Sequence, residues 1–135
     1  MKITRDTMIG GEREPGDLVA AIVAWWIDNH PEARLQFSLP HLGMMAEGAA
    51  HHAARFGIRT QPEVCAFANL MWLYGPRFDR VPSIERILAS RGSAMEKVRA
   101  LYLNVPDRDW DEAARARDED AWLRLVPGSD GEPAP

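Results

Sequence analysis

Glycine, proline and helix-capping residues divide this chain into short segments, and in nearly every segment the apolar residues recur with a period near 3.6. This period places them on one face of an α-helix, whereas a strand requires alternation. We therefore predict an all-α fold, a single compact bundle of about five to six short helices. The expected helices lie near residues 17–29, 38–56, 61–74, 83–90, 94–105 and 107–125.

Size and composition favour one domain. The chain has 135 residues, of which 46% are hydrophobic and 27% are charged, and this balance is typical of a soluble protein with one core. We expect the domain to span residues 1–126 and to begin with a polar arm over residues 1–15. Residues 127–135 are rich in glycine, proline and acid, which predicts a flexible C-terminal tail.

The same arithmetic limits location and partners. The longest apolar run, residues 18–27, rises only about 15 Å as a helix, which is too short for a membrane span. No apolar signal segment is visible near the N-terminus, and the lone Cys65 indicates a reducing compartment, so we expect a cytoplasmic protein. A net charge of −4 gives no basic field for nucleic acid.

Several residues carry helix-start signals. Thr60-Gln61-Pro62-Glu63 and Ser93-Ala94-Met95-Glu96 both match the capping box, in which the first side chain and the fourth each bond a backbone N–H. Ser38 and Ser83 are also predicted to be N-caps. These signals set the expected starts of four helices.

Tryptophan is unusually frequent, with five in the chain. A domain of this size has room to bury roughly two or three indoles completely. Trp25 and Trp26 are adjacent on one predicted helix, so their side chains point about 100° apart and cannot face the same core layer. We expect at least one of them at an interface or groove, the alternative being that several helices cover both. Trp25, Trp26 and Trp72 are the aromatic candidates for partner binding.

Acidic residues concentrate in residues 107–120, which hold seven acids and three arginines. Their interleaving predicts a solvated helix with ion pairs three and four residues apart. The competing interpretation is a docking surface for a basic partner. Its candidate residues are Asp111, Glu112, Asp118 and Glu119.

Evidence for catalysis is thin. Glu47 and His51 are four residues apart on a predicted helix and His52 follows, so they offer ligands for a divalent ion, but two ligands from one face do not close a site. Polar histidines on the helix surface are the ordinary interpretation. Cys65 lies in an apolar helix and is predicted to be an inert core thiol.

A corner is predicted at Gly75-Pro76-Arg77-Phe78-Asp79. Gly75 is suited to a positive φ after a helix, and Pro76 prevents the helix from continuing. Phe78 is expected to fold back as a hydrophobic anchor, and Asp79 to accept backbone N–H bonds in the turn. Such a corner sets the angle between two helices.

Together with Phe56-Gly57-Ile58 and Leu70-Met71, this corner forms a linear pattern over residues 56–88, about a quarter of the chain. The pattern resembles that of small helical proteins encoded beside type VI secretion spike and effector genes. The resemblance implies an accessory role, since that neighbourhood encodes adaptors, chaperones and immunity proteins alike.

Two classes of function follow. The favoured one is a non-catalytic protein-interaction module without a cofactor, adaptor-like for a type VI effector or spike component, with another bacterial protein as its partner. A variant is an immunity protein that neutralises a cognate toxin through the acidic segment. The other class is a small metal-dependent enzyme using Glu47, His51 and His52. A homodimer through the first helix is compatible with either class.

Overall fold

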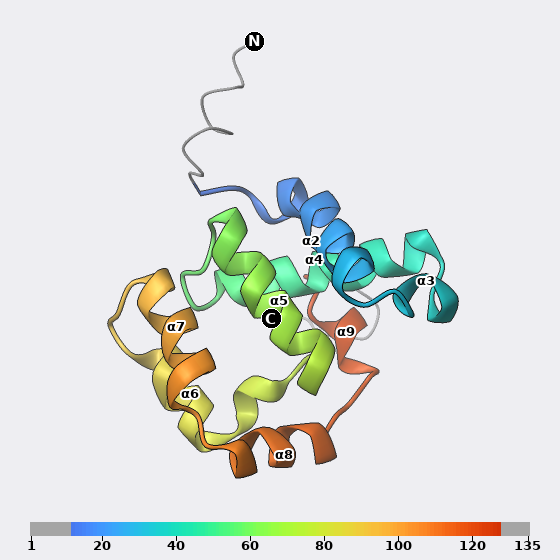
Figure 1. Cartoon of the computed structure of the whole chain (residues 1–135). Coiled ribbons are helices and arrows are strands. Elements are labelled where there is room, and N and C mark those ends of the chain that lie inside the picture. Colours follow the sequence, from blue (N-terminus) through green and yellow to red (C-terminus); the bar gives the residue numbers. More distant parts are fainter. Residues whose placement is uncertain (1–11, 128–135) are drawn as a thin grey trace.

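The computed structural model describes residues 12–127 and confirms the all-α prediction, since Figure 1 shows helices and no strand in this part of the chain. The described helices exceed the expected number, because the structure adds short ones at 33–36 and 78–80 and divides the last expected helix. Residues 1–11 of the predicted arm and 128–135 of the predicted tail lie outside the described residues. The elements are α2 (Pro15–Asn29), α3 (Ala33–Gln36), α4 (Leu39–Ala54), α5 (Gln61–Tyr74), η1 (Phe78–Arg80), α6 (Pro82–Ala89), α7 (Ala94–Asn104), α8 (Asp107–Arg115) and α9 (Ala121–Arg124).

Helix α5 runs through the middle of the bundle (Figure 1). On one side α2 and α4 pack against α5 and against each other, and on the other side α7 packs against it. Buried residues from every described helix join in one hydrophobic core. In α2 the buried residues are Leu18, Ile22 and Trp26. Their spacing of four residues makes one stripe, and the remaining apolar side chains of α2 lie nearer the surface.

Two of the predicted N-caps are confirmed. The Ser38 hydroxyl accepts a hydrogen bond from the His41 backbone N–H at 3.2 Å. Ser93 and Glu96 form a complete capping box, with donor–acceptor distances of 3.1 Å and 2.8 Å. These bonds satisfy backbone groups that the first helical turn leaves without partners.

Two others are wrong. Helix α6 begins at Pro82, so Ser83 lies inside it and instead donates to the Asp109 carboxylate at 2.7 Å. The Thr60 hydroxyl donates to the Glu63 carboxylate, and it accepts no backbone N–H as a capping box requires. In both cases the hydroxyl donates its hydrogen bond to a carboxylate and does not cap the helix.

The expected continuous helix over residues 107–125 is also wrong, because α8 ends at Arg115 and α9 begins at Ala121. Between them Arg117 donates to the carbonyl oxygens of Trp72 at 2.9 Å and Leu73 at 3.1 Å. Carbonyls in the last turn of a helix lack intrahelical partners, and a cation is stabilised there by the helix dipole. This contact, made across more than forty residues of sequence, holds the turn against α5.

Two glycines permit the C-terminal segment to pack closely. A Cβ added at Gly48 would lie only 2.7 Å from the Trp122 carbonyl oxygen. Gly75 has the positive φ expected of it, 108°, and an added Cβ there would lie 3.1 Å from Cγ of Arg117. Phe78 is buried after this corner, as predicted for an anchor. The corner and the C-terminal segment therefore depend on each other.

Candidate functional site

An apolar groove lies between α5 and α7 on the described surface. Helix α7 buries Val98 and Leu101, and its outer side exposes Met95, Tyr102 and Leu103 by 55%, 46% and 72%. These three lie within about 100° of arc on the helix. A helix with apolar residues on two sides has a second face that this chain does not cover.

The groove has a defined shape because hydrogen bonds join α7 to α5 along it. The Tyr102 hydroxyl donates to the Ala66 carbonyl at 2.8 Å and accepts from the Asn69 side-chain amide at 3.3 Å. Burial raises the pKa of Tyr102, so this hydroxyl remains a donor at neutral pH. The cavity has a volume of about 360 Å³. Its lining residues are Pro62, Glu63, Ala66, Met95, Val98, Arg99, Tyr102 and Leu103.

Sequence reasoning did not identify this groove. The apolar residues at 95, 102 and 103 were visible on the helix predicted near residues 94–105, but the sequence does not show which faces of that helix are covered. A signal was available, since Met95, Tyr102 and Leu103 follow helical spacing on a second side. Their exposure depends on which helices cover α7, and that is a property of the tertiary structure.

The adjacent tryptophans behave as their geometry predicts. Trp25 is 40% exposed, whereas Trp26 is fully buried. The Trp26 indole N–H donates to the Ala68 carbonyl at 3.1 Å, and its ring contacts Trp72 and Trp122 at centroid distances of 5.2 Å and 5.5 Å. Of the three aromatic candidates, Trp25 is exposed, as expected of at least one of the adjacent pair, and Trp26 and Trp72 belong to the core.

The estimate that about two or three indoles can be buried completely is not exceeded, because Trp26 is the only tryptophan of residues 12–127 with no exposed surface. Four of the five tryptophans are buried in the structure. Trp110, the fourth, stacks on Tyr74 at a centroid distance of 4.4 Å. Contacts between aromatic rings thus cover most of the surface of four indoles in a domain of this size.

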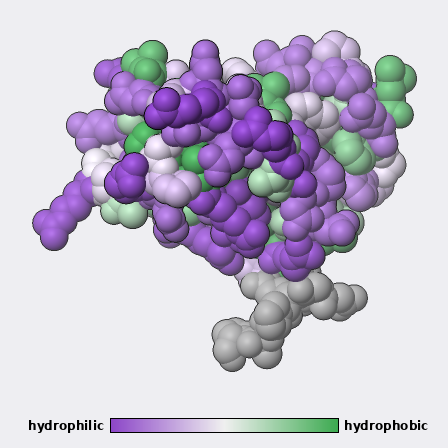
Figure 2. Space-filling view, turned by 90° about the horizontal axis from the view of Figure 1, so that it is seen from below, coloured by the Kyte–Doolittle hydropathy of each residue, from purple (hydrophilic) through white to green (hydrophobic). Residues whose placement is uncertain are grey.

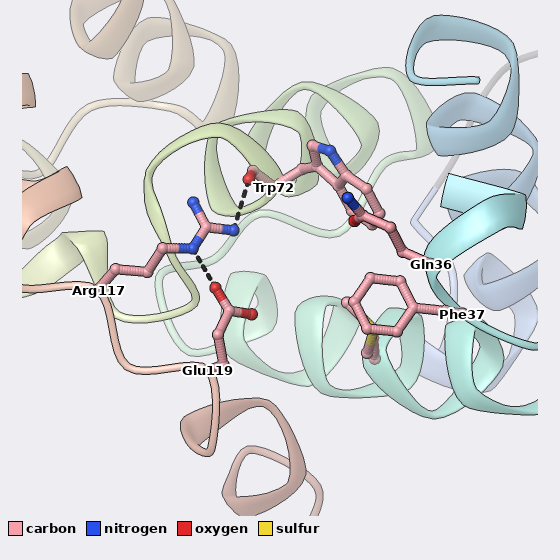
Figure 3. A pocket seen from close by; sticks show the side chains of 6 residues that line it. Gln36, Phe37, Trp72, Arg117 and Glu119 are labelled. Atoms are coloured by element: carbon pink, nitrogen blue, oxygen red, sulfur yellow. Dashed lines mark hydrogen bonds and ion pairs between the residues drawn. The ribbon is translucent and has the colours of Figure 1, made fainter. Parts of the chain in front are cut away.

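A second cavity, of about 210 Å³, opens beside Trp72 (Figure 3). Phe37 meets the Trp72 ring edge-to-face with centroids 5.9 Å apart. At the other side Arg117 pairs with Glu119 and bonds to the Trp72 carbonyl. This cavity brings together two predicted site residues, Trp72 and Glu119. The charged groups of Arg117 and Glu119 are therefore already paired within the chain. The cavity is also smaller than the groove.

The four candidate acids do not share one helix face. Asp111 and Glu112 are exposed on α8, while Asp118 and Glu119 lie in the following turn. Asp118 pairs with Arg124 at 2.8 Å, and Glu119 accepts from the Trp122 indole N–H at 3.0 Å. The predicted spacing of ion pairs is thus wrong for this turn, since its pairs are two and six residues apart.

The surface around α8 is nevertheless polar. Seen from below Figure 1, on the side where α8 lies, the molecule is mostly hydrophilic with separate hydrophobic residues (Figure 2). Neither Asp111 nor Glu112 has an ion-pair partner in the described part of the chain. Their carboxylates are therefore solvated and available to a basic group.

The three proposed metal ligands do not converge. Glu47 and His51 approach to 4.0 Å, but the His52 ring is buried and bonds to Asp79. Within residues 12–127 no group of three His, Cys, Asp or Glu side chains is placed to hold a metal ion. Cys65 is buried, as expected of a core thiol, and burial raises its pKa.

The expectation that His52 is a surface histidine is wrong. Its Nε2 lies 2.8 Å from Oδ1 of Asp79, and the Arg77 guanidinium donates to both carboxylate oxygens at 3.0 Å and 3.2 Å. The His52 ring also packs on Phe56 and Phe67. This network ties α4 to η1, and it replaces the backbone N–H bonds expected for Asp79.

Taken by itself, burial favours the neutral acid and would raise the pKa of Asp79. Hydrogen bonds from His52 and Arg77, together with their charges, outweigh this effect and lower the pKa to about 2. Asp79 is therefore a carboxylate at neutral pH and accepts from both neighbours. The His52 ring is closed off from solvent, so this His–Asp pair joins helices and is not in position to meet a substrate.

Comparison with models of known protein families, with curated proteins and with solved structures gave no match. None of the described helices combines the length and the apolar character that crossing a membrane requires.

Proposed function

We propose that this chain is a non-catalytic protein-interaction module that binds another bacterial protein through the groove between α5 and α7. The exposure of Met95, Tyr102 and Leu103 along a groove whose two helices are joined by hydrogen bonds carries this proposal. Exposed apolar patches on soluble proteins are typical of binding surfaces, because an uncovered apolar face otherwise costs free energy in water.

The class of partner comes from the resemblance. The pattern over residues 56–88 resembles that of accessory proteins encoded beside type VI secretion genes, and its corner is the segment that holds η1 against α4. We therefore propose an adaptor-like protein for an effector or spike component.

Binding to purified spike and effector proteins encoded beside this gene tests the proposal. We expect one of them to form a stable complex with the wild-type chain and to lose it with Leu103→Asp. The control is Leu35→Asp, since Leu35 is 88% exposed on α3 and does not line the groove. Absence of any complex, or a complex equally strong with Leu103→Asp, would contradict the proposal.

A second candidate, an immunity protein, is supported by the unpaired carboxylates of Asp111 and Glu112 on α8. Such carboxylates suit a basic surface on a toxin. Co-expression with a neighbouring toxin separates the two functions, because only an immunity protein restores growth. The double substitution Asp111→Asn and Glu112→Gln should then remove the protection from the toxin. Protection that survives this double substitution would exclude α8 as the contact.

A further inference from the structure

Charges along the groove identify the chemistry of its partner. The residues of α5 and α7 that are charged at neutral pH are Glu63, Glu96, Lys97 and Arg99. Glu63 accepts from the Thr60 hydroxyl, and Glu96 accepts from the Ser93 backbone N–H. Both acids are therefore already engaged at helix N-termini.

Of the two bases, Lys97 donates to the Phe56 carbonyl at 2.9 Å. Arg99 is exposed, lines the groove, and has no hydrogen bond or ion pair with any residue between 12 and 127. The groove thus presents apolar side chains around the guanidinium of Arg99, which is unpaired within residues 12–127. The Glu63 carboxylate on the opposite wall keeps its charge at the N-terminus of α5 and is hydrogen-bonded to Thr60. Arginine in such a setting is frequent at the centres of protein interfaces.

Position along α7 places this charge within the apolar stripe. Arg99 follows Met95 by four residues and precedes Leu103 by four, so the three lie in neighbouring turns on one side of the helix. They span about 12 Å along the axis, which is two turns of an opposing helix. The small Ala66 on α5 leaves room between the two walls.

We infer that the groove binds an amphipathic helix of a partner protein, with apolar side chains against Met95, Tyr102 and Leu103 and a carboxylate opposite Arg99. A third helix lying between two others repeats ordinary helix packing, and a carboxylate there complements the Arg99 guanidinium. This inference rests on the proposed function and adds the chemistry of the partner.

The test is selection from a displayed library of short helical peptides against the wild-type chain. We expect enriched peptides to combine apolar residues at spacings of three and four with Asp or Glu beside them. Leu103→Asp should weaken their binding on the order of 30-fold. Leu35→Asp is the matched control and should leave it unchanged.

Charge reversal then isolates the role of Arg99. Arg99→Glu should weaken the enriched peptides about tenfold, and peptides whose acid is replaced by Lys should bind this variant better than they bind the wild type. Arg34→Glu, an exposed reversal on α3, is the control. Circular dichroism of each variant verifies that the helices are retained.

The outcomes separate the two claims. Binding that depends on Leu103 but is indifferent to the charge at position 99 overturns the acidic-helix inference and leaves the groove as a binding surface. If no enriched peptide depends on Leu103, both the inference and the groove-based function fail.

Discussion

The two sides of α5 differ in how completely they are covered. On one side α2 and α4 close over it, and the Trp26 indole is fully buried with its N–H bonded to Ala68. On the other side α7 contributes Val98 and Leu101 to the core and leaves Leu103 largely exposed. The exposed Met95 and Leu103 of α7 are thus not needed to fill the core, and for this reason we assign binding to this face of α7.

The largest expected effect is on the covered side. Trp26→Ala should lower the free energy of unfolding by about 4 kcal/mol, because it leaves a cavity between the Trp72 and Trp122 rings. Trp25→Ala is the matched control and should cost about 1 kcal/mol, since that ring is already partly solvated. Chemical denaturation measures both, and equal losses would contradict the difference in burial.

Next in size is the junction between α4 and η1. His52→Ala should cost about 3 kcal/mol, because the buried Asp79 carboxylate loses one of its two side-chain partners. The neighbouring His51→Ala should change stability by less than about 0.5 kcal/mol, as its contact with Glu47 is long and partly exposed. A mild effect of His52→Ala would show that the network does not hold the corner.

Acid should weaken the same junction. Folding lowers the pKa of the Asp79 carboxyl from 3.8 to about 2. The ionised carboxylate therefore stabilises the folded protein fully above about pH 4, and this stabilisation is lost as the pH falls from about 4 to about 2. A shift of this size corresponds to about 2 kcal/mol. Denaturation curves across this range should show the loss in the wild type and a smaller one in Asp79→Asn. Parallel pH profiles for the two proteins would refute this assignment.

The smallest expected effect is on the open side. Leu103→Asp should change stability by less than about 0.5 kcal/mol, because the side chain is mostly in water already. Leu101→Ala, two residues away on the buried face of α7, should cost about 3 kcal/mol, because it leaves a cavity in the core. Thermal melts of the two variants compare the faces directly. A large loss for Leu103→Asp would place this residue in the core and remove it as a binding variant.

Sequence predicted features that depend on a few neighbouring residues. The Ser93 capping box follows from a four-residue pattern, and the opposite fates of Trp25 and Trp26 follow from the 100° turn per residue. The candidate site was harder. Trp25, Trp26 and Trp72 were alternative candidates for partner contact, and two of them are core residues. The groove at Leu103 was missed, because exposure depends on helices distant in sequence.

The polar contacts between distant residues could not be predicted from local sequence patterns, because they also depend on how segments far apart in the chain pack together. His52 and Asp79 are 27 residues apart, and Arg117 reaches carbonyls of α5 more than forty residues away. The sequence marked Asp79 as a turn residue, but it did not indicate which side chains would meet it. The break between α8 and α9 depends on such a contact, and so it was predicted as continuous helix.

By itself the sequence determined the helical character of this protein and most helix boundaries, because periodicity, capping and glycine or proline stops act within a few residues. Only the tertiary structure decided which apolar faces are closed and which remain open, because burial is settled between segments far apart in the chain. The groove beside Arg99 exists because no described helix covers that side of α7.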